Sequence, residues 1–100
     1  MKLKLIATRE FDEWLEELGP KERVQVDARL NLVANAEHFG DHKSVGDHVW
    51  ELRWKNGRRL YYALIPPSRV LLLLGGNKNG QSKDIRRAKK ALSVYTGIEA

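Results

Sequence analysis

The 100-residue sequence contains no cysteine, which excludes disulfides, thiolate nucleophiles and cysteine-based zinc sites. It also lacks an apolar run long enough to span a bilayer, and a run such as Val70 to Leu74 has the length of a buried strand. Its first residues alternate lysines with apolar residues and lack the apolar centre of a secretory signal, so we expect a cytoplasmic protein. The length and the 42% hydrophobic content indicate one folded domain, residues 1–100.

Positive charge is concentrated in the second half of the chain. Residues 1–50 carry seven Lys or Arg against ten Asp or Glu, a balance of −3, whereas residues 51–100 carry eleven against three, a balance of +8. Such asymmetry suggests a face for an acidic partner, and nucleic acid is the commonest polyanion that a small basic domain meets. Charge alone supports a solvated basic surface about equally well.

Apolar spacing predicts an α+β fold with the element order β-α-α-β-β-β-α. We expect a strand over 2–7, a helix between Thr8 as its cap and the Gly19-Pro20 stop, and a second helix from Pro20 to about His38. A polar loop over 41–47 leads to strands over 48–55, 58–65 and 69–75, turned by Asn56-Gly57 and by residues 66–68. A helix over 82–95 is expected last, with four residues facing inward: Ile85, Ala88, Leu92 and Tyr95.

This order and several motifs resemble the RelE/HigB-type addiction-module killer proteins over nearly the full chain. The motifs are Trp50-Glu51-Leu52-Arg53, Arg59-Leu60-Tyr61-Tyr62, Gly75-Gly76-Asn77-Lys78 and Gln81-Ser82-Lys83-Asp84-Ile85. The hairpin Lys55-Asn56-Gly57-Arg58-Arg59 departs from the pattern, because it is shorter than the turn common in the most similar subgroup.

The resemblance implies a small, mainly antiparallel sheet packed on helices and metal-independent cleavage of messenger RNA, usually on the ribosome. It implies no cofactor. It also implies neutralisation by an antitoxin, often a helix-turn-helix DNA-binding protein, with operator DNA reached only through that complex. Some members of the superfamily poison DNA gyrase instead, so a gyrase poison or another non-catalytic inhibitor is the alternative. A third hypothesis is a nucleic-acid-binding module without catalysis.

Metal-free RNA cleavage needs a base for the 2′-hydroxyl, cations for the phosphate and a proton for the leaving oxygen. With the resemblance, we expect Arg53, Arg59 and Lys78 to stabilise the phosphate, with Tyr61 or a lysine assisting proton transfer. Lys78 follows two glycines that allow a sharp turn and precedes a helix. The further RNA contacts expected in this basic half and in the loop before it are Lys43, Lys55, Arg58, Gln81, Arg86 and Arg87.

The pairing of the second and third strands decides whether the arginines meet. If hydrophobic faces set the register, Leu52 and Trp54 share a side with Leu60 and Tyr62, and the other side gathers Arg53, Arg59 and Tyr61. A strict two-residue Asn56-Gly57 turn would instead place Arg53 opposite Leu60, so this platform needs an odd-length loop or a bulge.

Histidines and aromatic residues give weaker signals. His38, His42 and His48 do not have the spacing of a metal site, so we expect no metal. His42 or His48 could act as an acid or base, although histidines in surface loops are usually solvated. The side chains that could stack on bases are Trp50, Trp54, Tyr61 and Tyr62, but we expect most of the tryptophan surface in the core, since both tryptophans share a strand face with Leu52.

Overall fold

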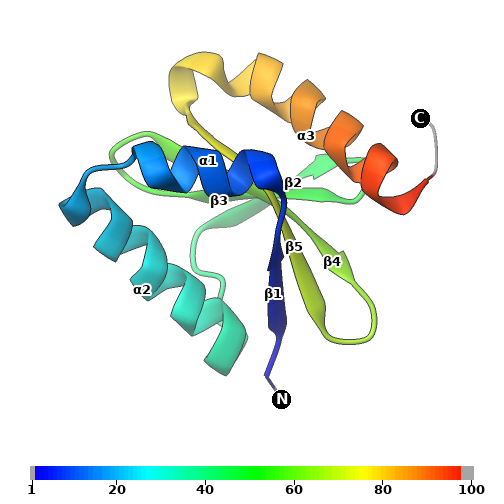
Figure 1. The fold of residues 1–100 in the computed structure, drawn as a ribbon, viewed down its shortest axis with the longest axis horizontal. Coiled ribbons are helices and arrows are strands. Elements are labelled where there is room, and N and C mark those ends of the chain that lie inside the picture. The colour runs from blue at the N-terminus through cyan, green and yellow to red at the C-terminus, as the bar shows by residue number, and fades with distance from the viewer. Residues whose placement is uncertain (1, 98–100) are drawn as a thin grey trace.

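A five-stranded sheet carries helices on both faces in the computed structural model, which describes residues 2–97 (Figure 1). The elements are β1 (Lys4–Ala7), α1 (Arg9–Glu17), α2 (Pro20–Ala36), β2 (His42–Gly46), β3 (Val49–Arg53), β4 (Arg58–Ile65), β5 (Arg69–Asn77), the single 3₁₀ turn η1 (Lys78–Gly80) and α3 (Gln81–Thr96). The strand order is β1-β5-β4-β3-β2, with β1 parallel to β5 and the other pairs antiparallel. The α+β class and the mainly antiparallel sheet are confirmed.

The predicted starts of the two helices in the first half of the chain are confirmed. The Thr8 hydroxyl accepts a hydrogen bond from the Phe11 N–H at 3.0 Å and so caps α1. Pro20 stands in the first turn of α2, where its missing N–H costs nothing. The predicted end of α2 at His38 is wrong by two residues, because Glu37 takes the left-handed conformation that closes the helix after Ala36.

The segment predicted as a loop contains an edge strand, which corrects the element order to β-α-α-β-β-β-β-α. β2 pairs with β3, and Asp47 and His48 make the two-residue turn between them, both with positive φ. Four of the five β2 residues are exposed and only Val45 is half-buried. A polar edge strand has no apolar alternation to reveal it, since its backbone pairing stabilises it.

Two hydrophobic cores lie on opposite faces of the sheet. Phe11 of α1 and Val26 of α2 belong to the first core, which covers the sheet face of Leu52, Leu60 and other apolar residues. The second core packs α3 on the other face and contains Tyr61, Leu71, Leu73, Ala88 and Leu92. The prediction that Tyr95 faces inward is wrong, because Leu92 is the last buried residue of α3.

Gly75 and Gly76 lie in extended strand β5, so the sharp turn predicted for them is wrong. A Cβ on Gly75 would stand 2.1 Å from the Trp14 ring, and a Cβ on Gly76 would stand 2.1 Å from Asp84 Oδ2. Such separations are far below van der Waals contact. The glycines therefore allow α1 and α3 to approach the strand from its two faces.

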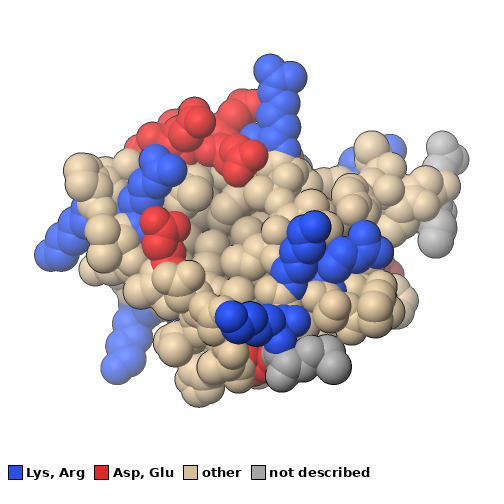
Figure 2. Space-filling view, turned by 60° about the horizontal axis from the view of Figure 1, so that its bottom comes forward, with Lys and Arg blue, Asp and Glu red and all other residues tan. Residues whose placement is uncertain are grey.

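Charges are segregated on the surface. Helix α1 contains five acidic residues within the nine of its span. In the view of Figure 2, carboxylates gather along the upper edge, while lysines and arginines stand at several separate places on the same face. Lysines and arginines thus do not form one continuous patch in this view. Within residues 2–97, no helix combines the length and apolarity that crossing a membrane requires.

Candidate functional site

The β3–β4 hairpin places two arginines directly opposite each other. Arg53 pairs with Arg59, and Leu52 pairs with Leu60 on the next rung. The Trp54 N–H donates to the Arg58 carbonyl at 3.0 Å, which leaves a three-residue loop over 55–57 with Gly57 at φ +100°. The odd-length loop required by the hydrophobic register is therefore confirmed.

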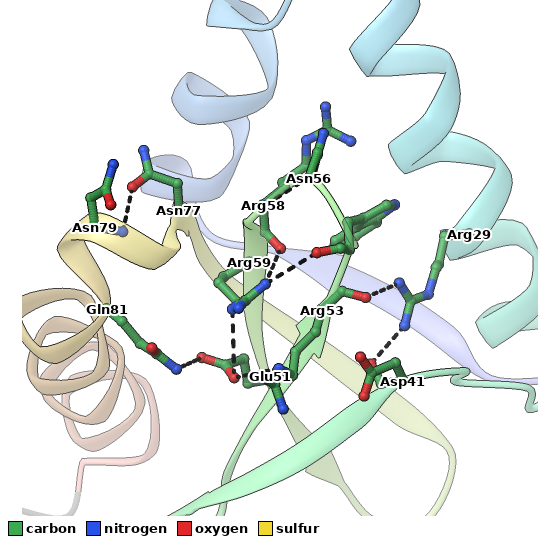
Figure 3. A network of polar contacts seen from close by, with 11 residues as sticks. Arg29, Asp41, Glu51, Arg53, Asn56, Arg58, Arg59, Asn77, Asn79 and Gln81 are labelled. Carbon is green, nitrogen blue, oxygen red and sulfur yellow. Dashed lines mark hydrogen bonds and ion pairs between the residues drawn. The ribbon is translucent and has the colours of Figure 1, made fainter.

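A buried glutamate connects the two arginines, as Figure 3 shows. Glu51 Oε1 lies 3.6 Å from Arg53 Nε and 3.9 Å from Arg59 Nε. From α3, the Gln81 side-chain amide donates to Glu51 Oε2 at 2.8 Å. The side chain of Glu51 is fully buried, that of Arg59 is 9% exposed and that of Arg53 is 37% exposed. We refer to Glu51, Arg53, Arg59 and Gln81 as the Glu51 cluster.

Further hydrogen bonds hold the guanidinium of Arg59 and the main chain at Arg53. Arg59 Nη1 donates to the Trp54 carbonyl at 3.2 Å and to the Arg58 carbonyl at 3.1 Å. Arg29 of α2 donates to the Arg53 carbonyl at 2.5 Å, which ties the end of β3 to the helix. A guanidinium held on several sides loses little additional conformational entropy when it binds a phosphate. The arrangement is thus preorganised for an anion.

Tyr61 shares the face of the Glu51 cluster but lies beneath the surface. It pairs with Glu51 across the sheet and is fully buried in the second core. Burial raises the pKa of the Tyr61 hydroxyl well above its usual range, and the neighbouring Glu51 charge raises that pKa further. The hydroxyl is therefore protonated at neutral pH and shielded from solvent, which argues against direct proton transfer to RNA.

The aromatic residues expected to stack on bases are mostly unavailable for that role because the fold uses them. Tyr61 and Tyr62 are buried in opposite cores. Trp50 and Trp54 are half-buried against the first core, as predicted from their shared strand face.

Lys78 is fixed to the tip of the arginine hairpin through its backbone. Its N–H donates to the Gly57 carbonyl at 2.8 Å, and its side-chain methylenes lie beside the Gly57 backbone. The Asn77 side chain accepts from the Asn79 N–H at 2.9 Å and closes the η1 turn (Figure 3). Lys78 is exposed at this position, next to the strand that carries Arg59.

Two other predicted RNA contacts lie at the surface beside the Glu51 cluster. Lys43 of edge strand β2 is exposed and pairs directly with Glu51. Lys55 is exposed in the hairpin loop between Arg53 and Arg59. Both lysines are therefore placed where they can contact a polyanion lying over the cluster.

Arg58 and the α3 arginines are not part of the cluster. The expectation that Arg58 contacts RNA is not supported, because it is buried on the opposite sheet face, where it donates to Gln25 at 3.2 Å and lies over the Trp54 ring. Strand alternation explains this, since Arg58 and Arg59 must point to opposite faces. Arg86 is exposed on α3, and Arg87 forms ion pairs with Glu10 and Asp84. The ion pair with Glu10 connects α3 to α1.

The histidines lie away from the arginines. His42 pairs with Leu52 on the other sheet face, and its ring packs near Phe39 and Trp50. His48 is in the β2–β3 turn, at the opposite end of β3 from Arg53, where it lines a cleft of about 520 Å³. Among the residues that the structure describes, no group of three carboxylates or histidines has the arrangement of a metal site.

Glu51 belongs to the motif Trp50-Glu51-Leu52-Arg53, but the sequence alone did not identify it as a functional candidate. Its alternation with Leu52 placed it on the same face of β3 as Arg53, but that pattern alone indicated no role. The pairing of β3 with β4 and the start of α3 are needed to bring Arg59 and Gln81 to it beside Arg53.

Comparisons with known proteins agree with the resemblance in the motifs. A family profile described as "Phage derived protein Gp49-like" matches residues 13–96. An uncharacterised protein of Haemophilus influenzae is 37% identical over 92 residues, covering 89% of this chain and 92% of that protein.

Solved structures give the same fold at low sequence identity. A mutant of the E. coli toxin RelE in the free state has a TM-score of 0.73 at 22% identity, covering 90% of this chain and 97% of that one. The E. coli RelBE toxin–antitoxin complex gives 0.65 at 20% identity, covering 75% and 95%. The RelBE2 complex of Mycobacterium tuberculosis gives 0.60 at 14% identity, covering 77% and 99%. The chain therefore belongs to the phage-derived Gp49-like family and has the fold of the RelE toxins.

Proposed function

We propose that this protein is the toxin of a toxin–antitoxin pair and that it cleaves messenger RNA on translating ribosomes in the cytoplasm, without a metal ion. The observation that carries the proposal is the pair of arginines, Arg53 and Arg59, held side by side on β3 and β4. Lys78 stands at the tip of the same hairpin. Two guanidinium groups on paired strands, with a lysine on the adjoining turn, suit a phosphate that gains charge during reaction.

In this reaction the 2′-oxygen attacks the adjacent phosphorus, so that the O2′–P bond forms and the P–O5′ bond breaks. The proton of the 2′-hydroxyl passes to a base, and a proton is delivered to the departing 5′-oxygen. Arg53 and Arg59 donate hydrogen bonds to the non-bridging oxygens, which carry the developing charge. Because Tyr61 is buried, Lys78 is the lysine that assists proton transfer in this proposal.

A metal-free cleavage assay tests the proposal. The purified protein is stripped of metal with EDTA and desalted, and then added to a translation reaction and to naked message, and the RNA ends are mapped. We expect the EDTA-treated and untreated proteins to cut the translated message at the same rate, and a rate loss of about 100-fold or more for Arg53→Ala, Arg59→Ala and Lys78→Ala. Arg69→Ala is the matched control, since exposed Arg69 begins β5 at the end opposite Asn77.

Three results would contradict this function. Retention of cleavage by all three alanine variants would show that the arginine hairpin is not the site. DNA damage with intact message after induction would favour a gyrase poison. Salt-sensitive RNA binding that falls uniformly as basic residues are removed, with no cleavage, would indicate a binding module.

An antitoxin partner is proposed from the family and from the outer face of α2. Val24, Ala28 and Leu32 follow one another at four-residue spacing and are all exposed, opposite the stripe that enters the core. Val24 is 67% exposed and Leu32 is 49% exposed. A helix that is apolar on two opposite faces indicates a protein partner.

The groove beside this stripe indicates the character of the partner. It has a volume of about 560 Å³ and is lined by Ala28, Leu32, Trp54, Arg29 and Lys55, among others. An acidic amphipathic segment suits such an apolar and cationic surface. We infer that it belongs to the antitoxin, itself a helix-turn-helix protein through which the complex reaches operator DNA.

Co-purification with the product of the adjacent gene tests this interface. We expect Val24→Lys combined with Leu32→Lys to abolish the complex. Val94→Lys is the control, because Val94 is 70% exposed on α3. Equal capture by the double variant and by the control would place the antitoxin elsewhere, and no capture by the wild type would refute the partner.

A further inference from the structure

Glu51 is a buried acid inside a site that should attract an anion. Its carboxylate is fully buried on β3, and burying an isolated charge is strongly unfavourable. Two guanidinium groups and one amide offset that cost. The question is what the carboxylate contributes to a site for phosphate, from which it should be excluded by charge.

Direct proton transfer is a poor explanation for Glu51. The carboxylate has no exposed surface, and the partly exposed side chain of Arg53 lies 3.6 Å from it. One oxygen accepts the Gln81 amide, and the other faces the two Nε atoms. A 2′-hydroxyl could reach Glu51 only if the arginines moved away from the phosphate they are proposed to bind.

The contacts of Glu51 orient both guanidinium groups through charge. At 3.6 and 3.9 Å, the distances from Oε1 to Arg53 Nε and Arg59 Nε are ion-pair contacts rather than hydrogen bonds. Attraction of this kind depends on the negative charge and persists in a buried site, where salt and water screen it little. A neutral side chain of the same shape would not replace it.

Counting charges suggests a second effect. Arg53 and Arg59 contribute +2 and Glu51 contributes −1, so the cluster carries +1, which matches the −1 of a phosphodiester in the ground state. The attacked phosphate approaches −2, and Lys78 on the adjoining turn supplies the additional +1. Without Glu51 the site would bind the ground state more strongly and gain less on going to the transition state.

We propose that Glu51 is a positioning residue that holds Arg53 and Arg59 at the spacing of one phosphate and limits their combined charge to that of the ground state. The amide of Gln81 anchors the carboxylate to the start of α3. This inference rests on the proposed RNA cleavage for its kinetic consequences, whereas its structural consequence is independent of catalysis.

The test compares Glu51→Gln with wild type in two kinetic measurements. One is the single-turnover cleavage rate, and the other is the affinity for an RNA made non-cleavable by a 2′-O-methyl group at the scissile nucleotide. We expect the rate to fall about 10- to 100-fold through misplacement of the arginines, while affinity stays equal or increases. Glu16→Gln is the charge-matched control, since Glu16 is exposed on α1 and its loss should change neither value.

An NMR measurement reports positioning without activity. Exchange of the Arg59 Nε–H with solvent should become faster in Glu51→Gln, because the ion pair that orients it is lost. If Glu51→Gln does not fold, Gln81→Ala retains the carboxylate and removes its anchor, and it should show a smaller loss of rate and faster Arg59 exchange.

The outcomes separate this inference from the proposed function. Unchanged rate and unchanged Arg59 exchange would refute positioning, as would a parallel loss of rate and affinity. Loss of the acidic limb of the pH–rate profile in Glu51→Gln would make Glu51 the base and overturn the inference. If wild type cleaves no message, the proposed function fails, while RNA affinity and Arg59 exchange still decide whether Glu51 orients the arginines.

Discussion

Replacing Gly75 by alanine should destabilise the protein through a clash with Trp14. The new Cβ would stand 2.1 Å from two atoms of the indole ring, whereas carbon atoms pack at about 3.5 to 4.0 Å. The ring must therefore retreat by roughly 1.5 Å. Overpacking of this size costs about 1–3 kcal/mol, and the smaller entropy of the unfolded alanine chain returns about 0.4–1 kcal/mol. We expect a net loss of about 1–2 kcal/mol, or roughly 4–16 °C in Tm.

A double-mutant cycle in urea isolates the cause. Gly75→Ala is measured alone and in the Trp14→Leu background, where the smaller side chain leaves room for the new methyl group. The penalty should fall to about 0.5 kcal/mol or less there, giving a coupling energy of about 1.5 kcal/mol. An equal penalty in both backgrounds would refute the steric explanation and show that alanine is unfavourable at this point of β5 for another reason.

Three further perturbations follow from the same structure. Gly76→Ala should displace Asp84 and with it the start of α3, which carries the Gln81 contact to Glu51. Message cleavage should therefore fall, and wild-type activity would contradict this. Thr8→Ala should lower the free energy of unfolding in urea by about 1–2 kcal/mol, because the hydroxyl caps α1 and donates to the Leu73 carbonyl at 2.6 Å, whereas Thr8→Ser should be nearly neutral. Burial raises the pKa of Asp84, so its ionisation opposes folding as pH rises above about 4. The stability of Asp84→Asn relative to wild type should therefore increase as pH rises from about 3 to 7. Calorimetry at several pH values measures this difference, and a difference that does not change with pH would contradict the reasoning.

The candidate site was predictable only in part. Alternation along β3 and β4 indicated that Arg53 and Arg59 share a face, because side chains in a strand point alternately to its two sides. The same alternation separates Arg58 from Arg59, so Arg58 lies on the opposite face and contacts Gln25. Glu51 required knowledge of three contacts that come from different segments, so no local pattern indicated it.

Local signals were sufficient wherever one segment decided the outcome. Thr8 and Pro20 began their helices as predicted, because a cap depends on residues within one turn. The apolar periods predicted the three inner strands and α3, since burial repeats along each element. The motifs additionally indicated the family and the α+β class, which the family profile and the RelE-like fold confirm.

Only the tertiary structure decided what depends on partners distant in the chain. β2 is a strand because β3 offers it a backbone edge, and its own residues give no apolar signal. Gly75 and Gly76 are glycines because Trp14 and Asp84 occupy the space of a side chain, although the sequence suggested a turn. The sequence by itself determined the elements other than β2 and the face that holds the arginines. Packing between elements determined how that face becomes a site.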